Sequence, residues 1–136
     1  MHMSLCVCAL IPTLVTRTEL VLVIHRIEDR RSTNTGRLAT EALPNSRVVM
    51  RGWTCDNDDE LEWSAESRPL FLFPHEDAVP LTSLASVAGD DRPVTLIVPD
   101  GNWRQASKVH RRIDALRDVP CVSLPLGEPS VYRLRH

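Results

Sequence analysis

The chain has 136 residues, of which 43% are hydrophobic and 25% are charged, and its formal net charge is −2. This length is typical of one domain, so we expect a single domain over residues 1–136. The small net charge excludes a global attraction to polyanions, and any nucleic-acid contact must come from a local cluster of cations. We expect neither a membrane span nor a signal peptide, and we therefore expect a cytoplasmic protein.

Two cysteines near the start of the chain, Cys6 and Cys8, are separated by one residue. Structural zinc sites need four ligands, which usually come in closely spaced pairs. One pair is half a site at best, so we expect zinc binding by the isolated chain to be weak or absent. Cys121 lies in an apolar run and is expected to be a buried thiol.

The first half of the chain predicts two strands and a short helix. Residues 19–24 form a continuous apolar run, which is typical of a buried parallel strand. A charged loop is expected at residues 28–32, and a helix at residues 38–43. A Thr or Asn before this helix can cap it, and exposed amides there also suit an anion or a cofactor carboxylate. A second strand is expected at residues 46–50.

The second half begins with an acidic stretch, residues 52–68, that we expect to be an exposed loop. Further elements are predicted by apolar runs and by helical spacing. The expected strands are residues 69–73, 94–98 and 121–124, and the expected helices are residues 82–87 and 102–117. Alternation of strands with helices predicts an α/β fold, with a mostly parallel sheet flanked by helices and residues 94–98 central in it.

The strand at residues 94–98 leads into Pro99, Asp100 and Gly101. We expect Pro99 to end the strand, because proline cannot donate to a sheet ladder. Asp100 then lies between the carboxyl end of a strand and the start of a helix, where open α/β sheets place ligands and reacting groups. An acid at this position can equally be a helix N-cap or part of a plain turn.

The helix at residues 102–117 has an apolar and a basic face. The apolar residues are Trp103, Ala106, Val109, Ile113 and Leu116. The basic residues are Arg104, Lys108, Arg111 and Arg112. The basic face fits either a solvated surface or a stripe of phosphate contacts. The sequence has no dinucleotide-binding glycine motif, Walker A loop, HExxH or nucleophile elbow, so hydrolase chemistry is unsupported.

Several fragments occur together in one order along the chain. They are Cys6-x-Cys8, TNTGRL at 33–38, LPNS at 43–46, DGNW at 100–103 and YRLR at 132–135. On these fragments the chain resembles the DTW-domain family, the tRNA-uridine aminocarboxypropyltransferases. The resemblance implies a SPOUT-like α/β fold, either knotted or an incomplete version. It also implies transfer of a 3-amino-3-carboxypropyl group from S-adenosylmethionine to N3 of a tRNA uridine, which releases methylthioadenosine.

The resemblance points to residues for each role. It makes Asp100 the general base, because Asp100 is the acid of the matched signature. It places Trp103 against the cofactor or the uridine ring, and Trp103 can equally be the first core residue of its helix. The residues expected to bind the cofactor are Thr33, Asn34, Thr35, Gly36, Pro99, Gly101, Asn102 and Tyr132. Those expected to contact RNA are Arg30, Arg31, Arg37, Arg104, Lys108, Arg111, Arg133 and Arg135. Arg30, Arg31 and Arg37 belong to this set only if their loop lies beside the loop that contains Asp100.

The chain departs from the family pattern in three places. Asn102 stands where the signature usually has Thr. Residues 1–12 match only the end of a cysteine-rich segment, which leaves Cys6 and Cys8 as an incomplete metal site. The family also continues beyond YRLR into a segment that completes the cofactor pocket. We therefore expect a member truncated at both ends. The alternatives are a SPOUT-like RNA methyltransferase, which would release S-adenosylhomocysteine, and a non-catalytic RNA-binding remnant.

Overall fold

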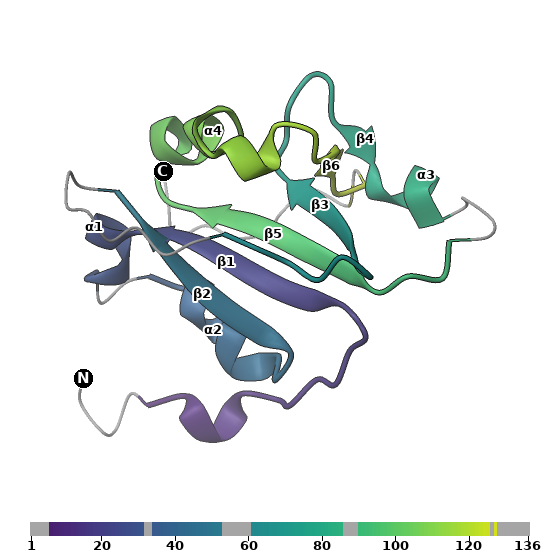
Figure 1. Ribbon diagram of the computed structural model, residues 1–136. Helices are drawn as coiled ribbons and strands as arrows, with labels where there is room; N and C mark the ends of the chain where they lie inside the picture. Colours follow the sequence, from purple (N-terminus) through teal and green to yellow (C-terminus); the bar gives the residue numbers. More distant parts are fainter. Residues whose placement is uncertain (1–5, 32–33, 53–60, 86–89, 126, 128–136) are drawn as a thin grey trace.

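A computed structural model describes residues 6–31, 34–52, 61–85, 90–125 and 127 (Figure 1). Within these residues six parallel strands form one sheet in the order β2-β1-β5-β3-β6-β4. The strands are β1 (Glu19–His25), β2 (Ser46–Arg51), β3 (Arg68–Leu72), β4 (Val79–Pro80), β5 (Val94–Asp100) and β6 (Cys121–Ser123). The helices are α1 (Arg26–Asp29), α2 (Gly36–Ala42), α3 (Leu81–Ala85) and α4 (Trp103–Arg112), with 3-10 turns at Cys8–Leu10 and Asp114–Leu116. The expected α/β class, parallel sheet and inner position of β5 are confirmed.

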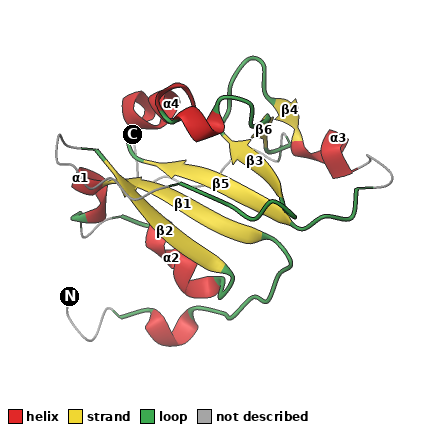
Figure 2. Cartoon of the chain, viewed as in Figure 1, coloured by secondary structure: helices red, strands yellow, loops and turns green. Residues whose placement is uncertain are grey.

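Helices cover both faces of the sheet, with α2 on one face and α4 on the other (Figure 2). Val21 and Val23 of β1 pack in the same hydrophobic core as Ala106 of α4. Alternate residues of β1 point to the other face, where Leu22 lies close to Gly36 at the start of α2. Burial on both faces explains why β1 reads as a continuous apolar run.

The connections that follow β1 and β5 go to opposite faces of the sheet. β1 and β5 are adjacent, and Ile24 is in register with Asp100. The chain leaves β1 toward α1 and α2, and leaves β5 toward α4 on the opposite face (Figure 1). Neighbouring strands whose connections go to opposite faces leave a crevice between them, the usual ligand site of open α/β sheets.

Several expected boundaries were wrong. β5 continues through Pro99, which is in register with Val23 of β1. Pairing of β5 with β3 ends at Ile97, so Pro99 needs no hydrogen bond to β3. The expected helix at residues 102–117 ends at Arg112 because Ile113 is extended, with φ −103° and ψ 109°. Residues 26–29, partly assigned to a charged loop, form α1, and β4 was not expected.

The acidic stretch expected to be an exposed loop is only partly described, since residues 53–60 lie outside the described part of the chain. Leu61, just after them, is buried in the core, and Trp63 packs against it. None of the helices in the described ranges has the length and apolar character needed to cross a bilayer.

Candidate active site

Asp100 is held in place by the loop that follows β1. Its Oδ2 accepts a 2.7 Å hydrogen bond from Nδ2 of Asn34. Asn34 is fixed in turn, because its Oδ1 accepts a 3.0 Å hydrogen bond from the backbone N–H of Gly36. The loop after β1 therefore lies beside the end of β5. This is the condition under which residues of that loop can share a site with Asp100.

Gly36 is required by the close approach of α2 to this carboxylate. A Cβ at position 36 would overlap Asp100 Oδ2 and would lie 3.3 Å from Cδ2 of Leu22. With the carboxylate in this position, glycine lets the first turn of α2 approach both groups.

Asn102, and not Asp100, caps α4. The Asn102 side chain accepts a 3.0 Å hydrogen bond from the backbone N–H of Gln105, and Gln105 Oε1 accepts a 2.9 Å bond from the Asn102 N–H. This capping box satisfies two donors at the start of α4. Asp100 is therefore free of the capping role. Asn and Thr are both good N-caps, so the departure from the family signature at Asn102 preserves this local structure.

A polar cavity of about 240 Å³ opens at Asp100, and we call it the Asp100 cavity. It is lined by Glu28, Arg31, Asn34, Thr35, Asp100, Gly101 and Asn102. Glu28 is only 8% exposed. Sequence reasoning missed this second acid, because it lies in a run of charged residues that is typical of a solvated loop. The cavity thus contains four residues expected at the cofactor: Asn34, Thr35, Gly101 and Asn102.

A second, apolar cavity of about 400 Å³ lies at the ends of β3, β5 and β6. It is lined by Leu72, Phe73, Pro74, Pro99, Gly101, Trp103, Ala106, Ser123 and Leu124. Trp103 is 66% exposed, and its ring centroid lies 5.0 Å from that of Phe73. Trp103 therefore lines the cavity instead of filling the core. Its exposed aromatic face suits stacking against a flat ring.

A third cavity, of about 410 Å³, lies between α4 and the ends of β1 and β2, and we call it the basic groove. Its lining is His25, Arg51, Gly52, Asn102, Arg104, Gln105, Lys108, Val109, Arg112 and Ile113. Four of these side chains are cationic and none is a carboxylate. Arg51 at the end of β2 was not expected to contribute, because it is far in sequence from α4.

The family of the chain follows from comparison with known proteins. The DTW domain model matches residues 1–136. The chain belongs to the DTW domain family. A curated relative is tRNA-uridine aminocarboxypropyltransferase 2 of Drosophila melanogaster, which is 31% identical over an alignment of 123 residues that covers 87% of this chain. The chain spans about half the length (48%) of that relative. No solved structure gives a significant match.

The cations expected at RNA separate into different places in this DTW domain. Arg104 and Lys108 line the basic groove, whereas Arg111 lines a different cavity that also includes Asp77. Arg31 lies 3.2 Å from Glu28, and Arg37 is paired with Asp29. Arg30 lies exposed beside Arg31. Thr33, Tyr132, Arg133 and Arg135 lie outside the described residues.

The CxC pair of the DTW domain is exposed, and its Sγ atoms lie 2.9 Å apart. Hydrogen bonding from Cys8 lowers the pKa of Cys6, and the same contact raises the pKa of Cys8. Cys121 donates a 3.3 Å hydrogen bond to the carbonyl of Phe73, and its partial burial raises its pKa. Weak or absent zinc binding at Cys6 and Cys8 stays a prediction, which rests on the fact that two thiolates do not complete a site.

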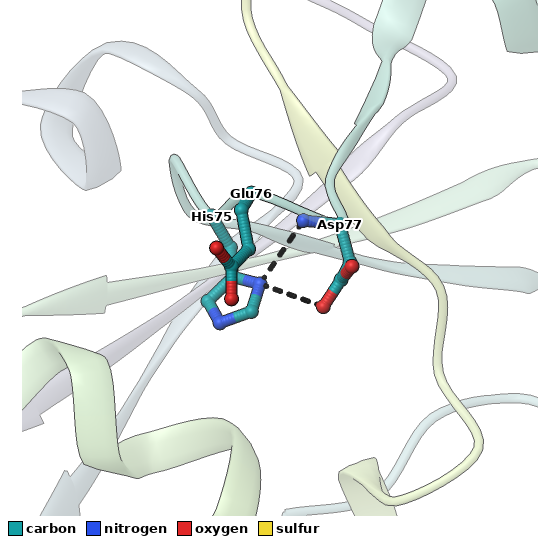
Figure 3. Close-up of side chains that lie close together, drawn as sticks. All are labelled: His75, Glu76 and Asp77. Atoms are coloured by element: carbon teal, nitrogen blue, oxygen red, sulfur yellow. Dashed lines mark hydrogen bonds and ion pairs between the residues drawn. The ribbon is translucent and has the colours of Figure 1, made fainter.

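Three possible metal ligands come together elsewhere in the described part of the DTW domain, at His75, Glu76 and Asp77 (Figure 3). All three are exposed. The His75 Nδ1 already accepts a 3.2 Å hydrogen bond from the Asp77 N–H and lies 3.4 Å from Oδ2 of Asp77. These contacts describe a polar turn after β3, and we assign no metal to it.

Proposed function

We propose that this DTW domain transfers a 3-amino-3-carboxypropyl group from S-adenosylmethionine to N3 of a uridine in tRNA. Family membership and the name of the fly relative support tRNA modification. The observation that carries the proposal is the placement of Asp100. It is free of the capping role, held by Asn34, and set in a polar cavity beside an apolar cavity and a basic groove.

The residues present fit the cofactor. The apolar cavity of about 400 Å³ falls within the size range of small-molecule sites, and it has Trp103 and Phe73 for a flat base. The adjoining Asp100 cavity supplies amide, hydroxyl and charged groups for a polar tail. Gly101 lines both cavities, so they lie next to each other. When bound, the cofactor supplies a sulfonium that makes its adjoining carbons electrophilic.

The role of Asp100 is to accept the proton of uridine N3. This nitrogen becomes a good nucleophile only when its proton leaves, and a carboxylate at hydrogen-bond distance is a suitable base. Asn34 keeps one carboxylate oxygen in a fixed position, which reduces the reorientation needed before proton transfer. Holding the uridine in line with the aminocarboxypropyl carbon, and not with the methyl carbon, would determine which group is transferred.

The basic groove is the candidate path for the tRNA backbone. Arg104, Lys108 and Arg112 form no ion pair within the described ranges, whereas Arg37, Arg47 and Arg92 are all paired with acids. Cations without acidic partners remain available to phosphates. Asn102 lines both the groove and the Asp100 cavity, so a backbone in the groove passes close to Asp100. We extend the contact set to Arg112, and also to Arg51 because it lines the same groove.

A single-turnover assay tests the proposal by following methylthioadenosine release and tRNA alkylation. We expect Asp100→Asn to lower the rate by about 10²–10⁴-fold, as expected for loss of a general base. The fold should persist, because an Asn oxygen can still accept the bond from Asn34. Asp114→Asn is the control, since Asp114 is exposed and paired only locally with Arg117.

Each other outcome of this assay identifies an alternative. Release of S-adenosylhomocysteine would show methyl transfer. Absence of any product from the unmutated chain, with normal tRNA binding, would show a non-catalytic RNA-binding protein. Full activity of Asp100→Asn would remove Asp100 from the mechanism.

A further inference from the structure

Glu28 is a buried acid that the proton-transfer role of Asp100 leaves unexplained. Its side chain is 11% exposed, and Oε1 accepts no hydrogen bond in the described part of the chain. Arg31 Nη1 lies 3.2 Å from this oxygen, but the Arg31 side chain is 57% exposed. Burying a carboxylate is costly unless hydrogen bonds and a close counter-charge compensate it, and a half-exposed arginine compensates weakly.

The Asp100 cavity has a charge pattern that suits a zwitterion. Two carboxylates, Glu28 and Asp100, and one guanidinium, Arg31, line about 240 Å³. The carboxylates give the cavity an excess of negative charge, which favours a bound ammonium. The exposed Arg31 can turn its donors toward an incoming carboxylate without leaving the cavity rim.

We infer that Glu28 binds the ammonium, and Arg31 the carboxylate, of an α-amino acid group in the Asp100 cavity. This inference rests on the proposed function, in which the transferred group carries such an amino acid end. The ammonium donates to Glu28 Oε1 and supplies the hydrogen bonds that this oxygen lacks. Anchoring the amino acid end fixes the aminocarboxypropyl chain beside Asp100, so both residues are positioning residues for the transfer.

A purely structural Glu28–Arg31 pair is the competing explanation. The two residues are three apart in the chain, and ion pairs at this helical spacing contribute little to stability. That role would not require the glutamate side to be buried in the wall of the cavity that contains Asp100. Ligand selectivity separates the two explanations, because a structural pair affects all ligands alike.

Calorimetric titration with three ligands tests the inference. S-adenosylhomocysteine has the amino acid group, decarboxylated S-adenosylmethionine has only its amine, and methylthioadenosine has neither. We expect Glu28→Gln to weaken binding of the first two by roughly 10- to 100-fold and to leave methylthioadenosine unchanged. We expect Arg31→Gln to weaken S-adenosylhomocysteine about 10-fold and to spare the decarboxylated ligand.

Glu41→Gln is the matched control, because Glu41 is exposed on α2 and does not line the cavity. Equal losses for all three ligands, or no loss for S-adenosylhomocysteine, would overturn the inference. If Glu28→Gln fails to fold, unchanged binding of S-adenosylhomocysteine by Arg31→Gln would overturn it. A wild-type chain that binds none of the ligands would instead refute the proposed function, and this inference with it.

Discussion

Asn34 donates a 2.7 Å hydrogen bond from Nδ2 to Oδ2 of Asp100, and the two residues are 66 positions apart in the chain. The bond connects the loop after β1 to the end of β5. Because Asn34 is itself fixed by the Gly36 N–H, the start of α2 determines how the Asp100 carboxylate is oriented. The orientation of the proposed general base thus depends on Asn34 and Gly36, which lie far before Asp100 in the sequence.

Gly36→Ala should impair the transfer without unfolding the protein. The new Cβ would overlap Asp100 Oδ2, so the carboxylate must move, and a displacement of about 1 Å can lower a rate by about 10²-fold. Gly127→Ala is the control, because no residue in the described ranges lies within 4 Å of a Cβ there. Methylthioadenosine release and a thermal melt measure both effects. Equal rates for the two variants would show that the position of Asp100 is unimportant.

Lys108→Ala and Arg112→Ala should each weaken tRNA binding and lower the slope of log affinity against log salt by about one unit. Each variant removes one cation from the basic groove. Arg111→Ala makes the same charge change on α4 but outside the groove, and it should leave the slope nearly unchanged. Filter binding at several salt concentrations provides the measurement. An equal decrease of the slope in all three variants would indicate that α4 attracts tRNA through its overall positive charge and not through the groove.

Cys6 should react with iodoacetamide faster than Cys8 and Cys121 near neutral pH. Its lowered pKa gives it more thiolate at a given pH, whereas the pKa values of the other two thiols are raised. Cys8→Ala should slow the alkylation of Cys6, because it removes the thiol that stabilises the thiolate. Peptide mass spectrometry over time gives the individual rates, and equal rates at Cys6 and Cys8 would contradict the prediction.

Thr95→Val should destabilise the fold while leaving ligand binding intact. Thr95 is 1% exposed, and its hydroxyl lies 2.9 Å from Glu19 Oε2 and 3.0 Å from Ser67 Oγ, at the amino ends of the strands. We expect a loss of about 1–2 kcal/mol in the free energy of unfolding, because buried partners lose a hydrogen bond. Thr16→Val, which removes an exposed local bond, should have little effect in urea denaturation. A similar cost for both would mean that the buried network adds nothing.

The sequence was informative where one segment determines its own structure. The apolar runs of β1 and β5 and the Asp-Gly turn were enough to place Asp100 at the carboxyl end of a central strand. The end of α4 was not predictable, since no Gly or Pro occurs between Trp103 and Arg117 to mark the extended backbone at Ile113. The burial of Glu28 and the bond from Asn34 to Asp100 depend on contacts between segments far apart in sequence, which periodicity does not report.

Gly101 and Asn102 form a wall that three cavities share, since Gly101 lines the apolar cavity and the Asp100 cavity, and Asn102 lines the Asp100 cavity and the basic groove. A shift of this turn changes the shape of all three at once. An occupant of the groove that moves this turn therefore alters the affinity of the apolar cavity for its own occupant. By reciprocity, whatever factor tRNA applies to the affinity for a small molecule, that molecule applies to the affinity for tRNA.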